Sequence, residues 1–156
     1  MLLLLNLSGR SLAATVSPIP DSPQPDASGH WIKSCSPKST KAAPRICVVK
    51  EETIVESGTI SAMLVETDST AKKLLRVTLP LGMDLRQGAS IIIDDRERIS
   101  VPYVACENQG CVADFDASNL ILLLKQGRKL AIQGTNGQGK FISYVLPLDD
   151  FAAAYD

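Results

Sequence analysis

The sequence predicts an all-β domain: an antiparallel β-sandwich or barrel-like fold with one or two short helices. Three observations predict it: apolar and polar residues alternate along short segments, turn-forming residues separate those segments, and few connections are long enough for the helix of a parallel βαβ unit. The 156 residues suit one domain with a hydrophobic core. A composition of 45% hydrophobic and 21% charged residues is that of a globular protein.

The first segment, residues 1–16, resembles the end of a clipped secretory signal peptide. Leucines cluster near its start, and Ser11 and Ala13 are small residues suited to a cleavage site. The usual basic residues before the apolar stretch are missing, so an apolar N-terminus without a targeting role is the alternative. Residues 17–29 hold four of the nine prolines and predict a Pro-rich linker. We expect the folded domain to span residues 30–156.

Eight or nine short strands are expected in this domain. In residues 73–80, Leu75, Val77 and Leu79 share one face while the residues between them are polar, which is typical of a half-buried strand. Other segments of alternating, β-branched or aromatic residues are 46–50, 59–66, 89–94, 98–103, 103–106, 111–115, 128–133 and 140–148. Gly, Asn and Asp in the intervening segments 80–88, 94–97, 107–110 and 135–139 predict tight turns and therefore antiparallel pairing.

Two short helices are expected. Residues 116–127 begin with an Asp or Ser suited to the N-cap, carry leucines at helical spacing at 120, 123 and 124, and end at Gly127 in the C′ position. A buried strand is the alternative for that leucine run. Residues 149–156 begin with aspartates and continue with alanines, which favours a short terminal helix.

Charge and hydropathy exclude two classes of partner. The net charge is −1 and the pI is about 5.8, so no basic field attracts nucleic acid or anionic lipid. No later stretch approaches the roughly 18 apolar residues that a membrane span needs. The expected partner is another protein or a cell-envelope component, and the sequence leaves its identity and the oligomeric state open.

Four cysteines, Cys35, Cys47, Cys106 and Cys111, admit three kinds of site. A zinc ribbon needs closer knuckles such as C-x2-C, and a redox pair needs C-x-x-C at a helix start. Neither spacing occurs, so we expect two local disulfides, Cys35 to Cys47 and Cys106 to Cys111, and an oxidising compartment. If residues 103–106 and 111–115 are antiparallel neighbours, Cys106 faces Cys111 across the turn; the other connectivities stay open.

Several spaced segments resemble one known family. They are "HWIKSC", "RICVV", "LPLGMDLRQGASIIID", "YVACENQGCVADF" and "LPLDDFAAAYD". On these segments residues 30–156 resemble the invasion-associated locus B proteins of Gram-negative bacteria, with Lys50 and Asp150 departing from the pattern. The resemblance implies a periplasmic or secreted β-sandwich with paired cysteines, and a role in host-cell invasion for members from pathogens.

No catalytic constellation stands out. His30 is the only histidine and lies at the domain edge, so a Ser-His-Asp or Cys-His site is not expected. Trp31 is expected to pack in the core against a disulfide. Acid pairs at 94–95, 114–116 and 149–150 fit turns and helix caps better than calcium or glycosidase sites.

The sequence therefore predicts a protein that is not an enzyme, needs no cofactor or metal, and acts by binding. The alternative is a thiol-disulfide or chaperone-like envelope factor that uses Cys106 and Cys111.

Overall fold

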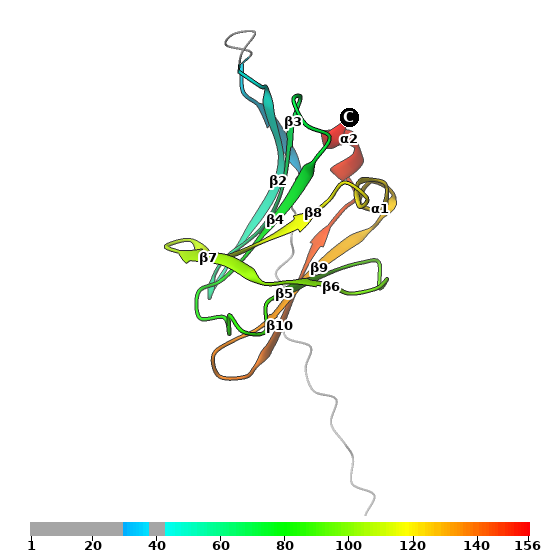
Figure 1. The fold of residues 1–156 in the computed structure, drawn as a ribbon. Helices are drawn as coiled ribbons and strands as arrows, with labels where there is room; N and C mark the ends of the chain where they lie inside the picture. Colours follow the sequence, from blue (N-terminus) through cyan, green and yellow to red (C-terminus); the bar gives the residue numbers. More distant parts are fainter. Residues whose placement is uncertain (1–29, 38–42) are drawn as a thin grey trace, which may run out of the picture.

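The strands form two antiparallel sheets that face each other (Figure 1). The computed structural model describes residues 30–37 and 43–156, so the expected signal segment 1–16 and linker 17–29 lie outside the described residues. The all-β sandwich prediction is confirmed, and both short helices are present.

The larger sheet has six strands in the order β1-β2-β3-β4-β8-β7. Its strands are β1 (Ile32–Cys35), β2 (Ile46–Val55), β3 (Gly58–Thr67), β4 (Lys73–Leu79), β7 (Tyr103–Glu107) and β8 (Gly110–Asp116). β2 and β3 form one long hairpin, and β7 and β8 form another that stands out at the sheet edge (Figure 1). β1 and β7 are therefore the edge strands of this sheet.

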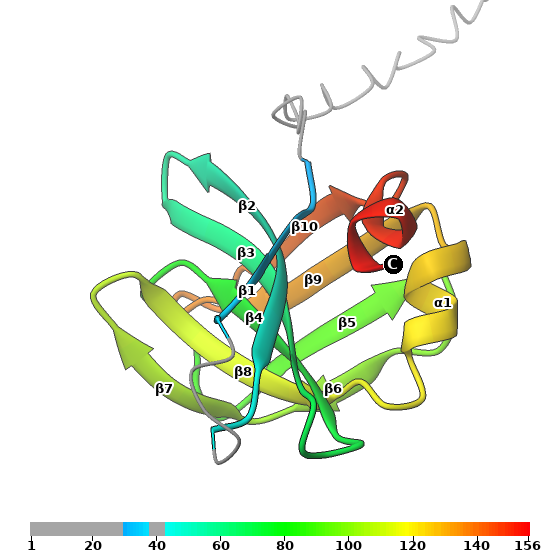
Figure 2. The same cartoon turned by 90° about the horizontal axis from the view of Figure 1, so that it is seen from above.

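The smaller sheet has four strands in the order β10-β9-β5-β6. They are β5 (Ala89–Ile93), β6 (Ile99–Val101), β9 (Lys129–Thr135) and β10 (Phe141–Pro147). The helices α1 (Ile121–Gln126) and α2 (Phe151–Tyr155) lie side by side at one end of the sandwich (Figure 2).

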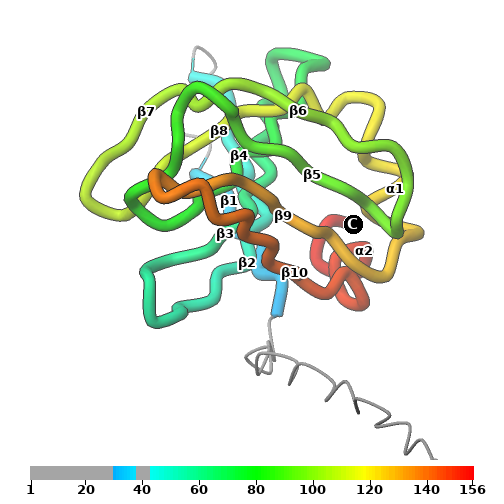
Figure 3. Tube along the Cα trace, turned by 90° about the horizontal axis from the view of Figure 1, so that it is seen from below, coloured from blue at the N-terminus to red at the C-terminus, as the bar shows by residue number. Residues whose placement is uncertain are grey.

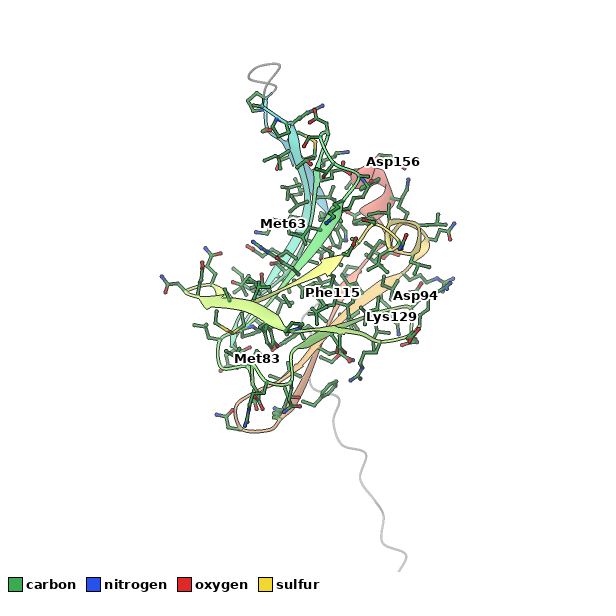
Figure 4. All side chains as sticks on the ribbon, in the orientation of Figure 1. Met63, Met83, Asp94, Phe115, Lys129 and Asp156 are labelled. Carbon is green, nitrogen blue, oxygen red and sulfur yellow. A yellow bond between two sulfur atoms is a disulfide. The ribbon has the colours of Figure 1, made fainter. Side chains whose placement is uncertain are left out.

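The core fills the space between the sheets. The alternation predicted for residues 73–80 holds, because Leu75, Val77 and Leu79 are fully buried. Phe115 on β8 lies between the sheets, whereas Met63 lies on the opposite side of the large sheet (Figure 4). Phe115 is 1% exposed, and burial of such side chains is the main stabilising contribution to the fold.

Residues 98–103 were expected to be one strand, and that prediction is wrong. β6 ends at Val101 in the small sheet and β7 begins at Tyr103 in the large sheet, with Pro102 between them. Proline has no backbone N–H to donate to a ladder, so the chain leaves one sheet at this residue and enters the other. The tube in Figure 3 follows this crossing from β6 to β7.

Two strand boundaries differ from the prediction. β1 was not expected, because Ile32–Cys35 is short and lacks an apolar alternation; its pairing with β2 holds it in place. β2 continues past residue 50 to Val55, although Lys50, Glu51 and Glu52 are poor strand formers. Pairing with β3 along the whole length overrides that local preference.

The first helix is present, but its predicted caps are wrong. Its N-cap is Leu120, without a side-chain capping bond, while the Asp116 carboxylate instead accepts a hydrogen bond from the Ser118 N–H. Gly127 is extended, with φ of −76°, so it is not the left-handed C′ residue that was expected. A Cβ there would lie 2.7 Å from the Leu123 carbonyl oxygen, so space rather than φ requires glycine.

Candidate binding surface

The outer face of the large sheet carries a broad set of side chains that no second sheet covers. The strand registers align Ile32, Lys50, Met63, Arg76 and Asp114 in one row across five strands. A parallel row consists of Ser34, Val48, Val65, Leu74 and Asp116. These residues alternate with the core residues along each strand, so they point away from the sandwich.

Apolar residues on this face are exposed to an unusual degree. Ile32 is 68% exposed and Ile54 is 78% exposed, whereas Met63, Val65 and Leu74 are half-buried. A contiguous exposed apolar patch on a monomeric protein is typical of an interaction site. We call the face formed by Ile32, Ile54, Val48, Met63, Val65 and Leu74 the outer apolar patch.

Paired charges lie within and beside the outer apolar patch, since Lys50 stands between Ile32 and Met63. Arg76 on β4 donates two hydrogen bonds of 2.7 Å to the two carboxylate oxygens of Asp114 on β8. Hydrogen bonding to Asp114 raises the pKa of Arg76 above its ordinary value, as expected for a bidentate charge-assisted pair. Lys50 and Glu52 form a second ion pair on β2. A patch with compensated charges within and beside it favours a partner of mixed polarity over a strongly charged one.

A disulfide holds the protruding hairpin beside this face. Cys106 and Cys111 are directly opposed in the β7–β8 register, with Cα atoms 4.0 Å apart and a bond between their sulfur atoms. Cys111 is 1% exposed, whereas Cys106 lies on the exposed side of the hairpin. Next to them is a hollow lined by Thr78, Glu107, Asn108, Gln109, Gly110 and Val112. The disulfide therefore fixes the polar tip at the edge of the candidate surface.

The second disulfide closes the other end of the large sheet. Cys35 on β1 is bonded to Cys47 on β2, again as a directly opposed pair with Cα atoms 4.0 Å apart. These two connectivities are the ones expected from the sequence. All four cysteines are oxidised, and no described cysteine is free.

A lysine cluster near the Cys35–Cys47 disulfide was not expected from the sequence. The ammonium groups of Lys33, Lys73 and Lys125 lie 5.4, 5.5 and 5.4 Å from the centre of the Tyr155 ring. Burial raises the pKa of Glu66, but hydrogen bonds from Lys73 and Tyr155 outweigh it and lower the pKa below 4.5. These contacts tie α2 to the large sheet, so we assign the cluster a structural role.

The remaining candidate residues have structural partners. The His30 Nδ1 lies 3.2 Å from the Asp150 Oδ2, and both side chains are at least partly exposed. Asp94 accepts hydrogen bonds from the backbone N–H groups of Arg128 and Lys129, which lowers its pKa and fixes the turn (Figure 4). Trp31 is buried and packs edge to face on Phe151, so its predicted core position is right.

The structure also bears on two other classes of site. Within residues 30–37 and 43–156, no group of three or more His, Cys, Asp or Glu side chains is placed to hold a metal ion. In the same residues, neither helix has the length and hydropathy required to cross a bilayer.

One buried residue was missed by the sequence reasoning. Glu51 is 1% exposed, and burial raises its pKa from 4.5 to about 7. Its burial could have been predicted from strand alternation. Glu51 lies two residues after Val49, so both side chains are on the inner face of the strand.

Comparison with known proteins identifies the family. The family model described as "Invasion associated locus B (IalB) protein" matches residues 31–156. Two curated relatives, invasion protein B homologs of Brucella abortus strain 2308 and of Brucella abortus biovar 1 strain 9-941, are each 30% identical over 132 residues. Each match covers 81% of this chain and 73% of the relative. No solved structure matches the chain. The family match spans nearly all of the described sandwich, and the chain belongs to the invasion associated locus B family.

Proposed function

We propose that this protein acts without catalysis, by binding another protein or a cell-envelope component through the outer apolar patch. The observation that carries the proposal is the exposure of Ile32 and Ile54, at 68% and 78%, on a sheet face that no second sheet covers. Isolated exposed apolar residues are ordinary, but here Val48, Val65 and Leu74 adjoin one another across three strands of the same face.

The proposed location is the periplasm or the outside of the cell. Two disulfides in a chain of this size are typical of an oxidising compartment. The names of the Brucella relatives, which are invasion protein B homologs, support a role for this chain in contact with host cells. Residues 1–16 would then serve export, and residues 17–29 would link that segment to the domain at 30–156.

Charge reversal on the outer apolar patch tests the proposal. Labelled wild-type protein is titrated onto envelope fractions of the source bacterium and onto host cells, with unlabelled protein as competitor. Ile32→Asp and Ile54→Asp place a charge where the contact requires an apolar group, and both sites are exposed enough to leave folding intact. We expect saturable binding by the wild type and at least tenfold weaker binding by each variant.

The matched control is Leu122→Asp on α1. Leu122 is 62% exposed, close to the exposure of Ile32, but it belongs to a helix at the end of the sandwich. This variant should bind like the wild type. Binding that survives both isoleucine substitutions, or that Leu122→Asp weakens equally, contradicts the assignment of the outer apolar patch. Treating the fractions with protease separates a protein partner from another envelope component.

A further inference from the structure

A carboxylate without a partner lies inside the sandwich. Among the described residues, Glu51 is the one Asp or Glu whose side chain is buried. Neither of its carboxylate oxygens has a hydrogen-bond partner in the described part of the chain. An ionised carboxylate in that position lacks both water and a counter-charge in contact, which is strongly unfavourable.

The side chain lies under a lid made of the two ends of the domain. The β1–β2 register pairs Ile32 with Lys50, and its continuation by one residue places Trp31 opposite Glu51. Phe151, the first residue of α2, packs edge to face on Trp31 with ring centroids 4.9 Å apart. α2 contacts both β1 and β2, close to the start of β1 (Figure 2). We call Trp31 together with α2 the terminal lid.

The terminal lid is held by aromatic packing, by the lysine cluster around Tyr155 and by two hydrogen bonds to backbone carbonyl oxygens. The Trp31 Nε1 donates a hydrogen bond of 2.8 Å to the Pro147 carbonyl oxygen, and the Lys33 Nζ donates to the Tyr155 carbonyl oxygen. α2 has only five residues and no side-chain N-cap bond. A helix this short is stable only through its packing, so an ionised carboxylate beneath it weakens the contacts on which its position depends.

We propose that Glu51 is a proton-operated latch: its neutral form lets the terminal lid close over β2, and its ionised form favours an open lid that admits water to the carboxylate. The two states differ in whether Trp31 and Phe151 are buried. The device concerns the conformation of the domain and stands independently of the outer apolar patch.

The charges around Glu51 support this assignment. Burial is the main cause that raises its pKa to about 7, the negative charge of Asp150 adds to it, and His30 opposes it. His30 pairs with Asp150 at 3.2 Å, so it is not a dedicated counter-charge for Glu51.

Lys33, the charged residue on the same face of β1 as Trp31, donates to the Tyr155 carbonyl oxygen and lies over the Tyr155 ring. Ala62 is the residue opposite Glu51 on β3, and α2 itself contains no charged residue. Lys50 and Glu52 point to the outer face, where they pair with each other.

Proton linkage sets the size of the effect. The pKa of the carboxyl group is near 7 under the closed lid and 4.5 in water. The ratio of open to closed lid is therefore about 300-fold larger at pH values well above both pKa values than at pH values well below them. The closed lid keeps the proton, so the change occurs as pH rises through the range between these two values.

Hydrogen exchange followed by mass spectrometry on the full chain tests the latch, with rates corrected for the intrinsic pH dependence of exchange. Peptides covering residues 151–155 report on the lid, and peptides covering 73–79 report on the core. In the wild type the lid protection should fall by up to about 70-fold between pH 5 and pH 8, and it should be lower than the core protection at both pH values, because the core opens only with the whole domain. In Glu51→Gln the lid protection should not change with pH.

Two further variants keep the test decisive. Glu51→Leu replaces the carboxylate by an apolar side chain and serves if the glutamine variant folds poorly; it should also show constant lid protection. His30→Asn removes the imidazole that interacts electrostatically with Glu51, and the wild-type pH response should persist in it. A wild-type lid whose protection is independent of pH overturns the proposal. So does a response that survives both Glu51 substitutions, or one that His30→Asn abolishes.

Discussion

Trp31 and Phe151 stand 120 positions apart in the chain and pack edge to face, with ring centroids 4.9 Å apart. Trp31 is 4% exposed and Phe151 is fully buried, so the contact joins the first and last described segments of the domain inside one core. The Trp31 indole also donates a hydrogen bond to the Pro147 carbonyl oxygen, which orients the ring.

Truncation of either ring should destabilise the domain strongly. Trp31→Ala and Phe151→Ala each remove a buried aromatic side chain, which typically costs about 3 to 5 kcal/mol of unfolding free energy. Phe141→Ala is the matched control, because Phe141 is 52% exposed, and it should cost about 0.5 kcal/mol. Urea denaturation measures all three. Equal effects of Phe151→Ala and Phe141→Ala would contradict the described packing.

The two disulfides should contribute unequally to stability. They join residues 12 and 5 positions apart, and the chain-entropy model assigns about 3 kcal/mol to the longer loop and about 2 kcal/mol to the shorter one. Double alanine variants of each pair, compared by denaturant unfolding, check this order. A larger loss for the Cys106–Cys111 pair would show that this bridge does more than close a loop.

Redox behaviour separates the binding function from the thiol-disulfide alternative. One sulfur of the hairpin bridge belongs to Cys111, which is 1% exposed, and the hairpin has no helix N-terminus to stabilise a thiolate. We expect the Cys106–Cys111 bridge to remain oxidised in a glutathione buffer at the potential of the bacterial cytosol. Rapid exchange with glutathione would favour the alternative function.

Two glycines at positive φ should differ sharply in their tolerance of alanine. Gly110 and Gly139 have φ of +144° and +78°, so alanine is strained at both sites. At Gly110 a Cβ would also lie 2.3 Å from the Leu79 carbonyl oxygen, whereas nothing lies within 4 Å at Gly139. Gly139→Ala should cost about 1 kcal/mol and Gly110→Ala about 3 kcal/mol or more. Thermal unfolding of the two variants measures the difference; similar losses would contradict the close β4–β8 approach.

Stability should depend on pH through Glu51. Its folded-state pKa is raised from 4.5 to about 7, so the native state holds more protons than the unfolded state between these values, and stability falls as pH rises through that window. The loss is at most about 3 kcal/mol and is complete above pH 7; opening of the terminal lid reduces it. Urea denaturation at pH 5 and pH 8 should show this loss in the wild type and not in Glu51→Leu. An equal loss in both proteins assigns the pH dependence to other groups.

The strand pattern could be predicted because alternation reports which face is buried. Leu75, Val77 and Leu79 fill the core as the period of two predicts, and the turns at 107–110 and 135–139 lie where glycine and asparagine indicated. Alternation does not tell which sheet a strand joins. The change of sheet at Pro102 depends on tertiary pairing, so one continuous strand was predicted instead.

The candidate surface was less predictable than the fold. The cysteine pairing followed from a local hairpin, but the alignment of Ile32 with Met63 depends on the registers of three strands. The environment of Glu51 likewise depends on long-range packing, because α2, from the end of the domain, contacts β2. A local sequence pattern predicts which face of a strand such a residue occupies, whereas pairing between distant segments decides what surrounds it.

We propose that the protein is an exported β-sandwich that contains two disulfide bonds. Peptide mass mapping of the non-reduced protein tests this proposal most directly. The protein is purified from its native host with free thiols blocked at lysis. The structure predicts linked peptides that join Cys35 to Cys47 and Cys106 to Cys111. Four blocked thiols would contradict the proposal, because they would place the protein in a reducing compartment with neither disulfide formed.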